Sequence, residues 1–178
     1  VFYAKWQTID YAITYDLNDA NSVSPATNST SNPATYTIED TVVFADPTRV
    51  GYKFTGWSIS NIDVGTYGEK TITANWQIIN YDITYDLNDS NSVSLATNNG
   101  TNPSTYTIEE NVTFIAPTRA GYEFAGWTLP SIAQGSTGAV STTATWEIIN
   151  YSITYDFAIA ESSKSQVVDN SANTVFSY

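Results

Sequence analysis

The chain has 178 residues, with 18 acidic side chains against 6 basic ones and a formal net charge of −12. So few cations cannot replace the counterions of nucleic acid or of an anionic membrane surface, and neither is an expected partner. Cysteine and histidine are absent, which excludes disulfides, thiolate metal sites and histidine-dependent catalysis. Because 42% of the residues are hydrophobic and no apolar run reaches the length of a membrane span, we expect folded domains without direct membrane insertion.

The chain contains an internal sequence repeat. Trp6, Trp76 and Trp146 recur at an interval of 70 residues, and the tyrosines that follow them keep the same interval. The spacing predicts four segments. These are the closing strand of a preceding repeat (residues 1–6), repeat 1 (7–76), repeat 2 (77–146), and the start of a third, degenerate repeat or a C-terminal cap or tail (147–178).

Each repeat is predicted to consist mostly of strands, and repeat 1 shows the pattern in chain order. In residues 11–17, YAITYDL, apolar and polar side chains alternate with the period of a half-buried strand. Residues 36–39, YTIE, continue this pattern, whereas residues 41–47 fit a short helical turn that ends at a proline. Residues 51–57, GYKFTGW, and 71–76, TITANW, complete the strands, with Asn-, Ser- and Thr-rich loops between them.

The phrase PTRxGYxFxGW occurs at residues 47–57 and 117–127 and contains both arginines of the chain. Gly51 is predicted to adopt a positive φ, and Gly56 to mark a bulge that moves Trp57 to the opposite face. We interpret the phrase as a scaffold in which Arg49 covers an aromatic ring and binds loop carbonyls. The alternative is a site in which the arginine and exposed aromatics bind a sugar or an anion. The structural motif residues are Pro47, Arg49, Gly51, Tyr52, Phe54, Gly56, Trp57, Trp76, Pro117, Arg119, Gly121, Tyr122, Phe124, Gly126, Trp127 and Trp146.

The joints between repeats, QIIN and EIIN, are too short and too apolar for flexible linkers. We expect Ile78, Ile79, Ile148 and Ile149 to pack into these joints and to make successive repeats a stiff rod.

Oxygen-bearing side chains follow the first strand of each repeat, and they suggest a calcium site. The candidate ligands are Asp16, Asn18, Asp19, Asn21, Asp86, Asn88 and Asp89. The spacing is not that of an EF-hand, which needs a loop glycine and a terminal glutamate. Asx turns explain the same residues, so no metal is assigned.

Catalysis has little support in the sequence. Two carboxylates are enough for glycosidase chemistry, and the adjacent pairs Glu39-Asp40 and Glu109-Glu110 are the available candidates. Neighbouring residues of a strand point to opposite faces, so we expect solvated edges, no enzymatic activity and no cofactor.

The combined pattern YxITYxLN, NPxTYTIE, PTRxGYxFxGW and TAxW resembles the Listeria–Bacteroides repeat, also known from internalin B-repeats. The resemblance covers residues 11–76 and 81–146. It implies a mostly β, β-grasp-like α+β module, found in tandem in secreted and cell-surface bacterial proteins and without catalytic activity. The chain departs from the family after LN, where Asp19-Ala20 and Asp89-Ser90 stand in place of the usual glycines.

Three functions follow as hypotheses. The first is a structural stalk of tandem modules arranged as an elongated rod, which projects another domain from a bacterial cell surface; its partners are the neighbouring repeats. The second is an adhesin that binds a host or surface protein or glycan through exposed Tyr and Trp. The third is a filament of identical chains assembled by strand exchange through residues 1–6, 151–157 or 158–178. All three place the protein outside the cell.

Overall fold

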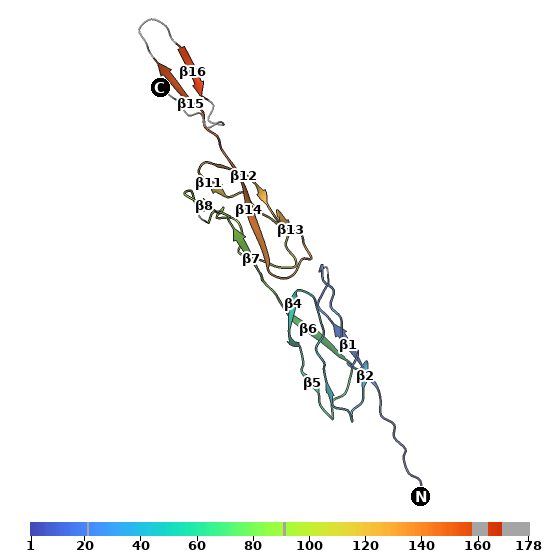
Figure 1. Cartoon of the computed structure of the whole chain (residues 1–178). Helices are drawn as coiled ribbons and strands as arrows, with labels where there is room; N and C mark the ends of the chain where they lie inside the picture. Colours follow the sequence, from blue (N-terminus) through green and yellow to red (C-terminus); the bar gives the residue numbers. More distant parts are fainter. Residues whose placement is uncertain (21, 91, 158–163, 169–178) are drawn as a thin grey trace.

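The computed structural model describes residues 1–20, 22–90, 92–157 and 164–168, and it contains two similar β modules that follow one another along the chain (Figure 1). Module 1 contains β1 (Tyr11–Asp16), β2 (Thr35–Tyr36), β3 (Val42–Val43), β4 (Tyr52–Trp57), β5 (Asn61–Ile62) and β6 (Lys70–Ile78). Module 2 contains β7 (Tyr81–Asp86), β8 (Ala96–Thr97), β9 (Thr105–Tyr106), β10 (Val112–Thr113), β11 (Thr118–Arg119), β12 (Tyr122–Trp127), β13 (Ser131–Ile132) and β14 (Val140–Ile148). The last strands, β15 (Ile153–Phe157) and β16 (Lys164–Val168), form a separate hairpin.

A four-stranded sheet forms the centre of each module. Its order is β2-β1-β6-β4 in module 1, and β9-β7-β14-β12 follows the same order in module 2. The two inner strands are parallel, with Tyr15 opposite Ile72, whereas the outer strands pair antiparallel with them. Ile72 and Ala74 are fully buried on one face of β6, as its period-two pattern predicts. The long closing strand thus holds the first strand and the GYKFTGW strand together.

The predicted bulge at Gly56 is confirmed. Its φ is 134°, and the register between β4 and β6 shifts between Phe54 and Gly56. The extra residue places Trp57 opposite Ala74, which turns the indole toward the core cluster. Gly126 repeats this geometry in module 2 with a φ of 147°.

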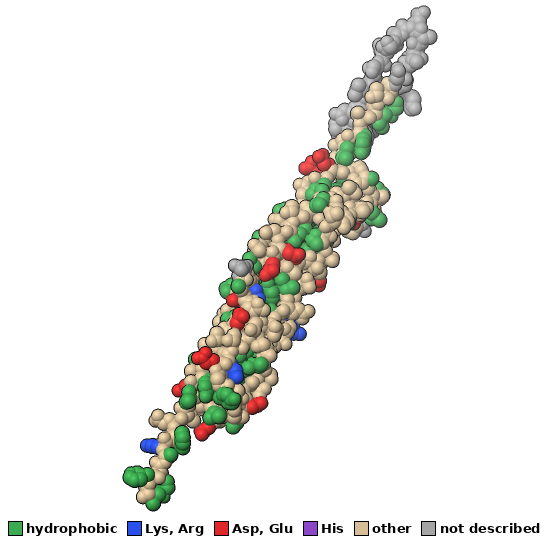
Figure 2. All heavy atoms as spheres, turned by 180° about the vertical axis from the view of Figure 1, so that it is seen from behind, with side chains coloured by type: hydrophobic (Ala, Val, Ile, Leu, Met, Phe, Trp, Pro, Cys, Tyr) green, Lys and Arg blue, Asp and Glu red, His purple; other side chains and the backbone are tan. Residues whose placement is uncertain are grey.

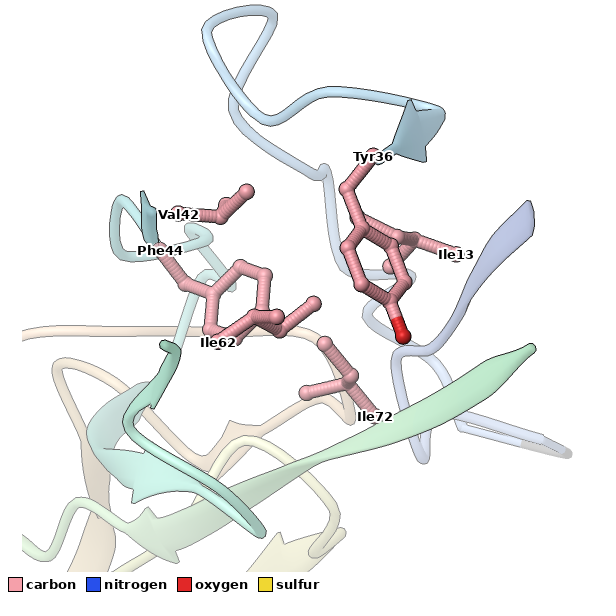
Figure 3. Packing of buried hydrophobic residues seen from close by; sticks show 6 residues of the cluster. All are labelled: Ile13, Tyr36, Val42, Phe44, Ile62 and Ile72. Carbon is pink, nitrogen blue, oxygen red and sulfur yellow. The ribbon is translucent and has the colours of Figure 1, made fainter. Parts of the chain in front are cut away.

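The core of module 1 lies on the inner face of the sheet (Figure 3). Tyr36 is buried, and its hydroxyl donates a hydrogen bond of 2.5 Å to the Gly68 carbonyl. Tyr15 and Trp57 pack edge to face beside this cluster, with ring centroids 5.5 Å apart. The six buried residues that converge in Figure 3 are Ile13, Tyr36, Val42, Phe44, Ile62 and Ile72.

Two expectations about local structure are wrong. Residues 41–47 form no helical turn, because the β-branched Val42 and Val43 pair with β5 as strand β3. The strand predicted at residues 36–39 ends at Tyr36, since the amide of Asp40 bonds back to the Thr37 carbonyl at 3.1 Å and closes a turn. The described residues contain no helix, so the modules are all-β and the expected α+β class is corrected. In the same part of the chain, no helix is long and apolar enough to cross a membrane.

The ends of the chain differ from the modules. Residues 1–10 form no strand, and their apolar side chains are exposed, so the assignment of residues 1–6 as a closing strand stays a prediction. Strand β15 pairs antiparallel with β16, whereas β1 and β7 pair with a parallel closing strand. The assignment of residues 147–178 as the start of a third, degenerate repeat or a cap stays a prediction. The segment assigned as a cap, donor strand or tail lies outside the described residues at 158–163 and 169–178.

The packing of β6 generates a test. Ile72→Ala removes a fully buried side chain and is expected to lower the free energy of unfolding by about 2–5 kcal/mol. Val43→Ala, at an exposed position of β3, is the control and should change it by less than about 0.5 kcal/mol. Urea denaturation of the full chain measures both values, and equal losses would contradict the described core.

Candidate functional site

Arg49 is bound by its own module. Its guanidinium carbon lies 3.7 Å from the centroid of the Tyr52 ring, while Nε donates to the Ser24 carbonyl at 3.0 Å and Nη1 to the Asn18 carbonyl at 3.3 Å. Arg119 repeats the three contacts in module 2, with 3.8 Å to the Tyr122 ring. Because the guanidinium covers a ring and binds loop carbonyls, the geometry favours the scaffold interpretation.

The acidic loop after β1 is closed by hydrogen bonds to its own backbone. Asp16 accepts from the amide of Asn18 at 2.9 Å, which confirms the Asx turn, and Asn18 adopts a φ of 51°. Asp19, which stands where the family usually has glycine, accepts from the amide of Ala26 at 2.6 Å. The predicted calcium ligands of repeat 2 lie in the same arrangement, whereas Asn21 lies outside the described residues.

Arg49 contacts this loop, because its Nη1 donates a hydrogen bond to the Asn18 carbonyl. The described part of the chain contains no group of three or more His, Cys, Asp or Glu side chains placed to hold a metal ion. The carboxylates of Asp16 and Asp19 therefore accept hydrogen bonds from backbone amides of their own loop.

The tryptophans of the modules are anchored. Trp57 donates its indole N–H to the Ala45 carbonyl at 3.2 Å, and Trp76 donates to the Leu17 carbonyl at 2.8 Å. Trp127 and Trp146 make the equivalent bonds at 3.1 and 2.8 Å. Trp6 differs, because 89% of its surface is exposed. Trp57 and Trp127 of the repeated phrase thus pack against the core of their own modules.

The contact between the modules is the feature that sequence analysis missed. Ile108 lies in the turn after β9 and is 2% exposed, although it is not part of the core cluster of module 2. Its side chain covers Gly51 of module 1 so closely that a Cβ on Gly51 would lie 2.7 Å from Ile108 Cγ2. Gly51 has the predicted positive φ, 78°, so this position requires glycine both for its backbone conformation and for the contact.

Polar contacts surround this apolar contact. The Glu109 carboxylate accepts hydrogen bonds from the Tyr52 hydroxyl and, at 3.4 Å, from Ser22 Oγ. Burial and then the bond to Glu109 raise the pKa of the Tyr52 hydroxyl, which stays a donor at neutral pH. The amide of Ile79 donates to the Gly51 carbonyl at 2.9 Å and holds the connecting segment against the same strand. We call the surface formed by Gly51, Tyr52, Ser22, Ile108 and Glu109 the joint.

The junction isoleucines behave differently at the two ends of module 2. Ile78 and Ile79 are partly buried, as predicted. Ile148 is 69% exposed and Ile149 is also exposed, so the expectation is wrong for the second junction. There the next strand joins the β15–β16 hairpin, and no turn equivalent to the one that carries Ile108 covers the junction in the described residues.

In the adjacent pairs Glu39-Asp40 and Glu109-Glu110, the second acid of each pair accepts hydrogen bonds within its own module. The Thr37 amide, and then the Thr37 hydroxyl, lower the pKa of the Asp40 carboxyl by hydrogen bonding to it. Glu110 accepts the equivalent bonds from Thr107 in module 2. Glu109 belongs to the joint, so the two acids of the second pair bind different partners.

Arg49→Lys is expected to lower the free energy of unfolding by about 1–2 kcal/mol, because lysine cannot bond both carbonyls while stacking flat on Tyr52. Arg119→Lys should have a similar effect in module 2. Thermal and urea unfolding measure both, with Lys53→Arg as a control at an exposed position. Unchanged stability of both arginine variants would contradict the scaffold interpretation.

Asp19→Ala removes the acceptor of the Ala26 amide and should destabilise the chain by about 1–3 kcal/mol. Because the loop closes on backbone amides, the loss should be the same in millimolar calcium and in chelator. A loss that appears only with calcium, measured as a shift in the unfolding midpoint, would restore the metal hypothesis.

Comparison with known proteins agrees with this geometry. The sequence model of the Listeria-Bacteroides repeat domain matches residues 11–78 and 81–154. Two relatives come from Evansella cellulosilytica. A "Putative membrane protein" is 28% identical over 71% of this chain and 19% of its own length, and a "Putative Gly-rich membrane protein" is 23% identical over 95% and 20%. The chain therefore spans about a fifth of these relatives. No solved structure matches. Because the two matches cover most of the chain and coincide with the two β modules, the protein belongs to the Listeria–Bacteroides repeat domain family.

Proposed function

We propose that the chain is a non-catalytic stalk, in which tandem modules form an elongated rod that projects another domain from a bacterial cell surface. The joint carries this proposal. A spacer works only if successive modules resist bending, and a contact between side chains of different modules supplies that resistance. The packing of Ile108 over Gly51 makes the two surfaces complementary in shape. The hydrogen bonds of Glu109 with Tyr52 and Ser22 fix how the surfaces are oriented toward each other.

The strength of the joint is modest. Complete burial of an isoleucine side chain contributes about 1.5–3 kcal/mol, so the partial burial of Ile108 by module 1 contributes on the order of 1 kcal/mol. The connecting segment keeps the two surfaces at a high effective concentration, which makes a small contact sufficient within one chain. Figure 1 draws the modules end to end, in support of a rod to which each module of this size adds about 30 Å.

An adhesin function has less support. Sugar binding through stacking requires exposed aromatic rings. Between residues 11 and 149, among the described residues, Tyr67 is the single exposed aromatic side chain. The face shown in Figure 2 carries scattered acidic side chains, which suits a solvated spacer.

A location outside the cell belongs to the same proposal. The relatives from Evansella cellulosilytica are named membrane proteins and are about five times longer than the part that matches. Repeat modules of a long membrane-attached protein fit a position between its anchor and a distal domain. The acidic surface keeps such a rod soluble.

The chain offers a matched pair of glycines to test the stalk. Gly51 and Gly121 have nearly equal φ values, 78° and 79°, but a Cβ collides with Ile108 at Gly51 and meets no atom within 4 Å at Gly121. Both substitutions to alanine strain the backbone equally. Only Gly51→Ala overpacks the joint, so it should destabilise the chain by about 1–3 kcal/mol more than Gly121→Ala.

Small-angle scattering gives the functional readout. The wild-type chain and Gly121→Ala should show the distance distribution of a rod with a defined bend between modules 1 and 2. Gly51→Ala should broaden that distribution while circular dichroism stays that of folded modules. A compact or freely jointed wild-type chain, or identical behaviour of the two variants, would refute the stalk proposal.

A further inference from the structure

Module 1 carries the same turn that module 2 uses at the joint, but there it faces solvent. Ile38 and Glu39 stand 70 residues before Ile108 and Glu109. Ile38 is 43% exposed, whereas Ile108 is 2% exposed. The difference in exposure measures how much of this side chain a neighbouring module covers.

The exposed turn already has the conformation of the docked one. The amide of Asp40 bonds to the Thr37 carbonyl at 3.1 Å, and the amide of Gly65 bonds to the Ile38 carbonyl at 2.8 Å. In module 2 the equivalent bonds, to Thr107 and Ile108, measure 3.2 and 2.8 Å. Because the backbone is held by its own module in both cases, Ile38 needs no rearrangement to bind a partner, and this lowers the entropic cost of docking.

An open cavity of about 350 Å³ lies beside this turn. Ile38 and Glu39 line one side of it, and Trp6, Ile9 and Tyr11 line the other. Among the residues at the equivalent positions 70 further on, Ile108 and Glu109 contact module 1, and Ile79 lies in the segment that connects the modules. At the N-terminal end of the chain Val1, Phe2 and Tyr3 are exposed as well.

Residues 1–6 have the pattern of a closing strand. Phe2 and Ala4 stand 70 residues before Ile72 and Ala74, which are fully buried in β6. Trp6 corresponds to Trp76, which pairs with Phe54 across the sheet and lies 5.8 Å below the guanidinium of Arg49. In module 1 the closing strand β6 therefore pairs with β4. Gly51 and Tyr52, at the start of β4, form the half of the joint that Ile108 contacts.

We propose that Trp6, Ile9, Tyr11, Ile38 and Glu39 form a docking surface for another module of this repeat, joined through residues 1–10 in the same polypeptide. Residues 1–6 complete the sheet of that module as its closing strand. In that module, the glycine at the position of Gly51 lies under Ile38, and the contact is possible because glycine has no Cβ. The hydroxyl of the tyrosine at the position of Tyr52 donates a hydrogen bond to Glu39. The inference rests on the joint that also carries the proposed stalk.

The test adds the module to the full chain. A copy of residues 11–70 is placed directly before Val1, so that Val1–Trp6 fall in the register of residues 71–76 and the interval of 70 continues. Ile38→Ala is introduced into the extended and the unextended chain, and Ile108→Ala into the unextended chain is the reference. Unfolding midpoints and hydrogen exchange of the Trp6 indole are measured.

In the unextended chain Ile38→Ala should lower the melting temperature clearly less than Ile108→Ala does, because Ile38 is 43% exposed whereas Ile108 is 2% exposed. In the extended chain it should lower the melting temperature by about 2–4 °C, as Ile108→Ala does in the unextended chain. Alanine at the copied Gly51 should reproduce the loss, whereas Gly121→Ala should act equally in both chains. The Trp6 indole should exchange as slowly as that of Trp76, whose N–H is bonded to the Leu17 carbonyl.

Three results would overturn the proposal. The first is an equal effect of Ile38→Ala in the two chains, and the second is a Trp6 indole that still exchanges freely after the extension. The third is self-association of the unextended chain that Ile38→Ala abolishes, since it would assign the surface to a second copy. Each leaves the stalk intact provided that Gly51→Ala and Gly121→Ala still differ, so the two proposals fail separately.

Discussion

The stacking of a guanidinium on a tyrosine ring is the interaction on which the rest of this structure depends. Arg49 fastens the loop after β1 through two carbonyls and, with its flat face, fixes the ring of Tyr52. The hydroxyl of that ring then meets Glu109 of the next module. Arg49 thus links the loop after β1 inside module 1 to the contact between Tyr52 and Glu109 of module 2. This explains why a chain with so few cations places both arginines in the same repeated phrase.

The two modules reach similar cores by partly different chemistry. Ile72 of module 1 corresponds to Thr142 of module 2, and both are buried. The Thr142 hydroxyl donates to the Leu129 carbonyl at 2.9 Å and accepts from the Leu129 amide at 3.1 Å, so its burial leaves no polar group unpaired. A small β module tolerates such exchange because shape and hydrogen-bond satisfaction are both kept, whereas the glycines at the bulge and the joint have no substitute of equal conformational freedom.

In the joint, each of the two contacting surfaces is also held in place by its own module. The turn that carries Ile108 is held by module 2, and the glycine that receives it belongs to a strand of module 1 that is paired with that module's closing strand. Because the backbone of each half is already hydrogen-bonded within its own module, forming the contact carries little entropic cost. Where the following strand leaves the repeat pattern, after β14, the isoleucines of the junction lie exposed. The described contact between side chains of neighbouring modules is therefore found where a complete module lies on both sides.

Features that depend on local conformation and on periodicity could be predicted from the amino-acid order. The interval of 70 residues predicted the modules, alternation predicted the long strands, and Gly51 and Gly56 predicted a positive φ and a bulge. That the segment YTIE ends as a turn and presents Ile108 to another module became visible in the folded chain. A single isoleucine after a tyrosine has the same pattern in a strand and in a turn. The burial of Ile108 depends on Gly51, which lies 57 residues earlier in the chain. The absence of a Cβ at Gly51 matters only after folding has placed the two residues in contact.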